Sequence, residues 1–376
     1  MVDFQSFTIN PQDMATEYKG NAILEILKGE LEYLNLSRLK IMALMIEAII
    51  KTQTICLWKL CEVIPLKAKA LSINRRLQRF VSEVVFNPLV LAKIIVHLCD
   101  VKGKVYLIMD RTNWKLGDSN INILMLSLSY EGKGIPLFWK FLNKRGNSNV
   151  EERIELLKQF KKAFPELEIA GFLADREFIG EDWFNKLNEL NIPFIIRVRN
   201  NFQICRKYKL QNIKNLFRRL SVNEYNLIHP KRLVLNVQLF ISGMKILNKE
   251  HRVDYCIVVS NFDRDNSLEV YRLRWQIECM FKNLKSSGFD IEATHLTKHE
   301  RLNALLSVVS IAYVWVVKVA EKMLQVAKCN KILNHGRRQI SEFRQGLREL
   351  KKFYSFQIQR VMKIMFNFCH ILRNYL

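Results

Sequence analysis

The sequence lacks the cysteine and histidine spacing that marks a zinc site or a disulfide framework. It has eight cysteines in 376 residues, but no two form a C-x-x-C pair and none has a histidine nearby at zinc-ligand spacing. Most lie in apolar runs, as in Leu98-Cys99 and Tyr255-Cys256-Ile257. We therefore expect reduced core cysteines in a cytoplasmic protein.

Acidic residues are scarce relative to basic ones. Lysine and arginine total 59 against 36 aspartates and glutamates, which gives a formal net charge of +23. An excess of this size opposes compaction of the isolated protein and favours a polyanionic partner. Nucleic acid is the first candidate, and an anionic membrane surface is the second.

A long uninterrupted apolar run is also missing. Residues 1–21 have no basic start followed by an apolar segment, so we expect no signal peptide. The most apolar stretch, Leu302–Val317, contains Asn303, Ser307 and Ser310 and is shorter than the ~20 residues that a spanning helix needs. We expect a buried core helix here and no membrane partner. A peripheral membrane protein is an alternative that rests on charge alone.

The sequence does contain enough apolar residues, 49%, for a sizeable core. The first 100 residues repeat apolar positions at helical spacing. Within them, the basic stretch 71–80 carries Arg75, Arg76 and Arg79. This stretch and the short helical segment before it suggest a helix-turn-helix-like DNA reader, and a solvated helix face is the alternative.

From Lys104 onward the pattern changes to alternating strands and helices. The strand–strand–strand–helix–strand–helix–strand order predicts an α/β fold with one core sheet. A β-rich insertion is expected over residues 200–254, with an alternating strand at Leu233–Ile241. The expected strands are 104–110, 121–130, 135–141, 168–174, 192–198 and 255–259, and the expected helices are 149–164, 181–190, 268–286 and 298–325.

Two aspartates directly follow strand-like runs. Asp110 follows the first and Asp175 the fourth, so their carboxylates share one edge of the sheet if these strands are parallel neighbours. Carboxylates held close together repel each other unless a cation lies between them, and a hard ion such as Mg²⁺ relieves that repulsion. Alternatively, each aspartate simply ends a strand, and Asp118 and Glu177 are rival acids nearby.

A third group of polar residues lies on the expected helix 268–286. Tyr271, Arg274, Glu278 and Lys285 are spaced three, four and seven apart, which places them on one face of an α-helix. An ordinary ion pair between Arg274 and Glu278 would explain only part of this pattern. One carboxylate flanked by a phenol and two cations suits a metal-bound phosphodiester better.

These residues resemble the bacterial insertion-sequence transposases that have a ribonuclease-H-like catalytic domain and a D-D-E triad. More narrowly, the chain is similar to the cut-and-paste branch marked by Y-x-x-R-x-x-x-E-x-x-x-x-x-x-K, over about residues 104–325. The resemblance implies a ribonuclease-H-like mixed sheet flanked by helices, with a β-rich insertion and helical terminal regions. The chain departs from the family pattern at Glu177, where relatives often have a small residue, and in having no tryptophan between Asn200 and Asp254.

The resemblance also implies a reaction. Asp110, Asp175 and Glu278 would be the catalytic triad and the ligands of two Mg²⁺ ions, with Mn²⁺ as a substitute. The enzyme would cleave transposon ends and join the 3′-hydroxyl to target DNA. Tyr271, Arg274 and Lys285 would contact the DNA backbone.

We further expect three regions: a DNA-binding region (1–100), a catalytic domain (101–327) interrupted by the insertion, and a basic helical region (328–376). The expected partners are double-stranded DNA and a second copy of the chain in the DNA complex, in the cytoplasm of a bacterium at the nucleoid. Two alternatives stay open. One is a structure-specific nuclease of the same fold that does not join strands. The other is a catalytically silent DNA-binding regulator derived from a transposase.

Overall fold

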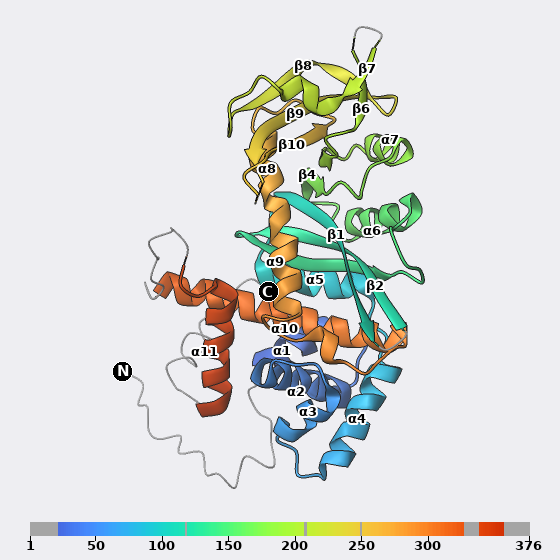
Figure 1. Cartoon of the computed structure of the whole chain (residues 1–376). Coiled ribbons are helices and arrows are strands. Elements are labelled where there is room, and N and C mark those ends of the chain that lie inside the picture. Colours follow the sequence, from blue (N-terminus) through green and yellow to red (C-terminus); the bar gives the residue numbers. More distant parts are fainter. Residues whose placement is uncertain (1–21, 117–118, 207–208, 249, 327–337, 357–376) are drawn as a thin grey trace, which may run out of the picture. The chain divides into compact units, whose positions relative to one another are not determined.

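The computed structural model describes residues 22–116, 119–206, 209–248, 250–326 and 338–356 (Figure 1). The chain divides into two compact units. Residues 95–282 form the sheet unit, and residues 1–94 with 283–376 form the helical unit. The regional boundaries expected at residues 100 and 327 stay predictions. Of the expected basic region 328–376, only residues 338–356 are described, and they contain helix α11 (Glu342–Phe356).

The helical unit combines the two ends of the chain. Its N-terminal helices are α1 (Ala22–Glu30), α2 (Leu36–Thr52), α3 (Leu57–Val63), α4 (Ala70–Glu83) and the first part of α5 (Pro88–Cys99). Helix α2 starts at Asn35, whose side chain accepts a hydrogen bond from the Arg38 amide, as N-cap residues do. Helices α10 (His299–Val326) and α11 pack against α2, so the core of this unit needs residues from both ends of the sequence.

Helix α10 contains the most apolar stretch of the chain. Among the described residues, His299–Met323 is the one helix that is long and apolar enough to cross a membrane. Two bent helix pairs, α2–α3 and α4–α5, would also be long and apolar enough, but only if each pair formed a single span. Within the protein, 94% of the apolar window of α10 is buried. This burial is what a core helix requires, because its apolar side chains are already removed from water.

The sheet unit is built on one mixed sheet of eight strands. Three antiparallel strands come first: β1 (Lys104–Leu116), β2 (Ser119–Tyr130) and β3 (Lys133–Phe141). Strand β1 then pairs in parallel with β4 (Glu168–Ala174), and β4 with β5 (Phe194–Val198). Spatially the order is β3-β2-β1-β4-β5-β10-β9-β8. The first five positions are the ribonuclease-H-like arrangement, which confirms the predicted fold class.

Helices lie on both faces of this sheet. Figure 1 shows α6 (Val150–Ala163) and α7 (Glu181–Glu189) on one side and α9 (Trp275–Leu284) on the other. On the first side, the β4 side chain Phe172 packs edge-on against Trp183 of α7, with ring centroids 5.6 Å apart. Alternate side chains of a strand point to opposite faces, so neighbouring residues on β1 and β4 face different helices.

The predicted helix 268–286 is present but not uniform. It consists of α8 (Ser267–Tyr271), a 3₁₀ turn at Arg272–Arg274 and α9. Helix α9 lies close to strand β3, because a Cβ on Gly134 would be only 2.9 Å from the carbonyl oxygen of Gln276. Glycine at this position lets the two backbones approach, since it has no side chain to fill the gap.

The insertion is β-rich, as expected, but one prediction within it is wrong. It contains β6 (Gln203–Arg206), β7 (Lys209–Asn212), β8 (Tyr225–Val234) and β9 (Val237–Leu247), and β10 (Val253–Ser260) returns to the core sheet. The single strand predicted at Leu233–Ile241 is instead the end of β8, a two-residue turn and the first half of β9. Leu235 and Asn236 both have positive φ, 48° and 59°, which is the backbone of a two-residue type I′ turn.

Candidate active site

Asp110 and Asp175 lie side by side at one end of the parallel ladder. The last partners on β1 and β4 are Met109 and Ala174, and each aspartate is the next residue along its strand. The sequence predicted that this strand ends at Asp110. Strand β1 instead continues to Leu116 in its pairing with β2. The two carboxylates nevertheless share the carboxyl-end edge, where open α/β sheets place their ligands.

Backbone amides orient both carboxylates. The Arg111 amide donates to Asp110 Oδ1 at 2.7 Å, and the Glu177 amide donates to Asp175 Oδ1 at 2.8 Å. Each bond engages one carboxylate oxygen and leaves Oδ2 for another partner. The direction of each carboxylate is thus set by its own chain segment.

Arg274 connects the third carboxylate to the first. Its Nη1 lies 3.4 Å from Asp110 Oδ2, and its Nη2 forms an ion pair with Glu278 Oε1. Its guanidinium also lies over the Tyr271 ring, 5.8 Å from the centroid. The side chains of Asp110 and Arg274 are only 16% and 12% exposed, whereas that of Glu278 is 34% exposed. Tyr271, Arg274 and Glu278 therefore do share one helical face, which points at Asp110.

The electrostatics of Asp110 reflect this crowding. Burial, together with the charges of Asp175 and Glu278, raises the pKa of Asp110 to about 7, although the Arg111 amide and Arg274 act to lower it. A carboxyl group that senses two other carboxylates in a partly dry site is one that a bound cation would keep ionised. The site is short of positive charge even with Arg274 in place.

The donor set fits a hard divalent metal in type. Carboxylate oxygens are the ligands that Mg²⁺ takes in proteins, and three of them face this edge of the sheet. Within the described ranges, however, no three His, Cys, Asp or Glu side chains are close enough together to hold a metal ion as they stand. Arg274 lies between Asp110 and Glu278, so Glu278, the most exposed of these groups, would have to turn away from it to bind a metal with Asp110.

Tyr271 is buried beside this site. Its hydroxyl has no hydrogen-bond partner in the described structure, and burial raises its pKa. A buried hydroxyl without a partner costs free energy, so it is a donor available to a substrate oxygen.

An ion pair that the sequence did not reveal joins the two aspartate segments. Arg111 Nε lies 2.7 Å from Glu177 Oε1, and Arg111 Nη2 lies 3.0 Å from Glu177 Oε2. Glu177, the rival acid beside Asp175, is therefore engaged in a two-point ion pair. No local pattern signals this pair, because its members are 66 residues apart.

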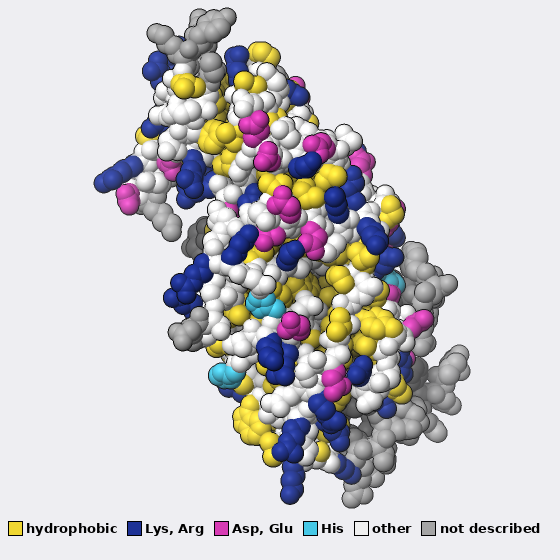
Figure 2. Space-filling view, turned by 90° about the vertical axis from the view of Figure 1, so that its right-hand side faces the viewer, with side chains coloured by type: hydrophobic (Ala, Val, Ile, Leu, Met, Phe, Trp, Pro, Cys, Tyr) yellow, Lys and Arg dark blue, Asp and Glu magenta, His cyan; other side chains and the backbone are white. Residues whose placement is uncertain are grey.

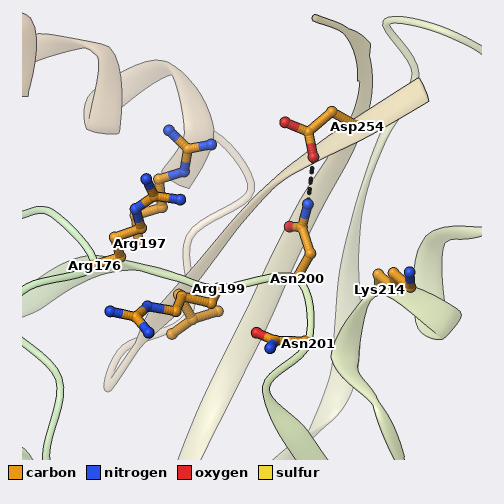
Figure 3. A pocket seen from close by; sticks show the side chains of 8 residues that line it. Arg176, Arg197, Arg199, Asn200, Asn201, Lys214 and Asp254 are labelled. Carbon is orange, nitrogen blue, oxygen red and sulfur yellow. Dashed lines mark hydrogen bonds between the residues drawn. The ribbon is translucent and has the colours of Figure 1, made fainter. Parts of the chain in front are cut away.

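A basic pocket opens next to the carboxylate edge. Its volume is about 270 Å³, and in Figure 3 the guanidinium groups of Arg176, Arg197 and Arg199 lie on one side, opposite the hydrogen bond from Asn200 to Asp254. Lys214 lines it as well. None of these four cations forms an ion pair with an acidic residue in the part of the chain described. Arg176 follows Asp175, and Arg197 follows Ile196, the β5 partner of Ala174.

The remaining predicted site residues lie in the helical unit. Arg75, Arg76 and Arg79 are exposed on α4, whose opposite face buries Ile73 and Leu77. Lys285 comes one residue after the end of α9, and its Nζ lies 2.8 Å from Glu292. The structure thus brings Asp110, Asp175, Tyr271, Arg274 and Glu278 together in the sheet unit, whereas Lys285 belongs to the helical unit.

Positive charge is also spread over the surface. On the face drawn in Figure 2, lysine and arginine side chains occur from top to bottom, with acidic side chains between them. The presence of basic residues therefore does not by itself single out one site on this face.

A mixed sheet of this order, with carboxylates at the end of its central parallel pair and a third on the helix after the insertion, defines an α/β protein of the ribonuclease-H-like class. A family model described as "Transposase DDE domain" matches residues 102–315, which is more than half of the chain. The chain belongs to this transposase family. Its membership confirms the resemblance inferred from the D-D-E and Y-R-E-K residues, and the family typically uses divalent metal ions.

Similarity to individual proteins is weaker than the match to the family. No curated protein matches the chain. Among solved structures, the chain is similar to one described as the cryo-EM structure of piggyBac transposase synaptic complex with hairpin DNA, at 12% identity and a TM-score of 0.40. The match covers 73% of this chain and 59% of that chain.

Proposed function

We propose that this transposase cleaves DNA at transposon ends and joins the freed 3′-hydroxyl to target DNA, with Asp110, Asp175 and Glu278 as its catalytic carboxylates. The observation that carries the proposal is Arg274, which contacts Asp110 and Glu278 at once. This contact draws residues from β1 and the 3₁₀ turn before α9, 164 positions apart, into one site beside Asp175. An arginine so placed is suited to bind a phosphate oxygen of the same substrate.

The three carboxylates would hold Mg²⁺, for which Mn²⁺ can substitute. Two such ions, when bound, activate the attacking oxygen and stabilise the leaving one. The protein's own residues do the rest. The Arg111 and Glu177 amides keep Asp110 and Asp175 facing the edge of the sheet, and Arg274 neutralises phosphate charge once it releases Glu278. Tyr271 donates its free hydroxyl to a backbone oxygen.

The basic pocket supports a DNA substrate. Four cations that form no ion pair with the acidic residues described in the structure repel each other, and phosphate groups relieve that repulsion. Since Arg176 and Arg197 adjoin the carboxylate edge, a DNA strand cut at Asp110 and Asp175 would place a neighbouring phosphate here. Arg75, Arg76 and Arg79 on α4, and Lys285, would contact DNA outside the sheet unit.

The biological setting follows from this proposal. Bringing together two transposon ends requires two active sites, so we expect a homodimer in the DNA complex. We place the reaction in the bacterial cytoplasm, on nucleoid DNA.

The test uses a duplex that carries the inverted repeat expected beside the coding region. Glu278→Gln should reduce end cleavage by ~10³-fold or more, about 4 kcal/mol of transition-state stabilisation, while end binding stays near the wild-type level. Glu269→Gln is the matched control, because Glu269 is an exposed acid on α8 and is not one of the two acids that pair with Arg274. Full cleavage by Glu278→Gln in Mg²⁺ would refute the assignment.

The same assay separates the alternative functions. A transposase yields joined products in which the labelled end is covalently attached to target DNA. Cleavage without joined products would instead identify a nuclease, and binding with neither would identify a DNA-binding regulator.

A further inference from the structure

Arg111 and Glu177 form a two-point link between the segments that carry the catalytic aspartates. Both oxygens of the Glu177 carboxylate are used, at 2.7 and 3.0 Å from the Arg111 guanidinium. The side chains are only 17% and 20% exposed, so the pair is screened less by solvent than a surface ion pair. Paired guanidinium and carboxylate groups of this geometry fix orientation as well as distance.

The backbones of the same two residues hold the aspartates. The Arg111 amide binds Asp110 Oδ1, and the Glu177 amide binds Asp175 Oδ1. Each partner of the ion pair therefore orients one catalytic carboxylate with its main chain and binds the other partner with its side chain. The ion pair therefore ties together the two backbone segments whose amides set the directions of the carboxylates.

The pair is itself held in place. Arg111 Nη1 donates to Asn122 Oδ1 at 3.1 Å, and Asn122, which is fully buried, donates to the carbonyls of Lys144 and Gly146. On the other side of Glu177, the next residue, Phe178, is buried beneath the Arg153 guanidinium, 4.7 Å from its ring centroid. A side chain fixed on several sides cannot shift without disturbing β2 and α6.

We propose that the Arg111–Glu177 ion pair is a positioning device that sets the separation and direction of Asp110 and Asp175 for metal binding, and that Glu177 is not a metal ligand. This inference rests on the proposed function. An acid two residues after a catalytic aspartate would otherwise compete for the metal and add negative charge to a site already crowded with carboxylates. Arg111 keeps that acid neutralised and turned away.

The experiment measures Mn²⁺ binding directly, by electron paramagnetic resonance titration of the DNA-free protein, with thermal unfolding recorded alongside. The variants are Arg111→Met, Glu177→Gln, the double variant and Asp110→Asn. Glu155→Gln is the matched control, because Glu155 pairs with Lys140 on the same unit but touches neither aspartate. Arg111→Lys tests whether charge without the planar two-point geometry is enough.

If the ion pair positions the aspartates, Arg111→Met and Glu177→Gln should each weaken Mn²⁺ binding by ~10- to 100-fold, as expected when a group that orients a ligand is removed. The double variant should be no weaker than the worse single variant, because the two residues act as one unit. Arg111→Lys should fall between Arg111→Met and the wild type, and Glu155→Gln should match the wild type.

Three outcomes would overturn the proposal. Wild-type or tighter Mn²⁺ binding by Arg111→Met would mean that released Glu177 serves as a ligand. Additive losses in the double variant would mean that the residues act separately, and a loss that only tracks a lower unfolding temperature would mean a structural role alone. If Asp110→Asn binds Mn²⁺ as the wild type does, the proposed metal site fails, and the positioning role fails with it.

Discussion

The backbone of Gly134 on β3 runs so close to α9 that a Cβ would lie 2.9 Å from the Gln276 carbonyl oxygen. Helix α9 carries Glu278, so this approach helps to place the third carboxylate. Gly134→Ala should push α9 outward, cost about 1–3 kcal/mol through overpacking, and reduce cleavage more than DNA binding. Urea unfolding and an end-cleavage assay would measure the two effects.

The control for this substitution is Gly29→Ala. Gly29 lies in helix α1, and a Cβ there would meet nothing within 4 Å. Replacing it should be neutral or stabilise the protein by up to about 1 kcal/mol, since alanine favours a helix. Equal effects of the two substitutions would show that the close approach to α9 has no special importance.

Asp110 makes the stability of the metal-free protein depend on pH. Its pKa is about 7 in the folded protein against 3.8 for the free side chain. Between these values the folded state holds a proton that the unfolded state has released, so stability falls as pH rises. At about 1.4 kcal/mol per pKa unit, the full loss above pH 7 is roughly 4 kcal/mol.

Asp110→Asn should remove this dependence, because asparagine carries no charge and still accepts the Arg111 amide. The variant should be more stable than the wild type at pH 8, with the difference shrinking toward pH 4. Thermal unfolding in a metal chelator, repeated across that range, would show it. A difference that does not change with pH would contradict the raised pKa.

Mg²⁺ should stabilise the protein more at high pH than at low pH. Protons compete with the metal for Asp110, and its pKa near 7 places that competition between about pH 6 and 8. We expect a larger rise in unfolding temperature with Mg²⁺ at pH 8 than at pH 6, and no such rise in Asp110→Asn. An equal rise at both pH values would place the stabilising metal elsewhere.

The arginines of α4 should contribute to DNA affinity by neutralising phosphates. Replacing Arg75, Arg76 and Arg79 with alanine should weaken binding and flatten its salt dependence by about 0.9 in log–log slope for each phosphate that is no longer neutralised. Lys28→Ala is the control, because Lys28 is paired with Glu25 in the same unit. If the salt dependence of DNA affinity is unchanged in the triple variant, these arginines only form a solvated face of α4 and do not contact DNA.

Much of the catalytic sheet could be predicted from the sequence. Strand β4 matches its expected bounds, and the apolar runs before Asp110 and Asp175 placed both residues at the end of the parallel ladder. The spacing of Tyr271, Arg274, Glu278 and Lys285 predicted one shared face, and the Arg274 contacts bear this out for Tyr271 and Glu278. These features are local, because each depends on residues within one or two turns or one strand.

The features that the sequence did not reveal depend on distant partners or on a short backbone reversal. The Arg111–Glu177 pair joins β1 to the loop after β4, and although Glu177 is an unusual residue beside Asp175, nothing in the sequence connects it with Arg111, 66 positions away. At Leu235 and Asn236, apolar alternation continues through the hairpin turn, so the period shows no break and positive φ alone makes the reversal. The packing of α10 and α11 on α2 likewise has no local signature.

The contact between Arg274 and Asp110 has a consequence for synthesis of the protein. Ribosomes synthesise the chain starting from its N-terminus, and Arg274 comes 164 positions after Asp110. The nascent sheet strands β1 and β4 therefore emerge with two carboxylates facing each other well before their arginine exists. A gene copy interrupted between the codons for Asp175 and Arg274 would yield a fragment with both aspartates, no Glu278, and no means of completing the proposed active site.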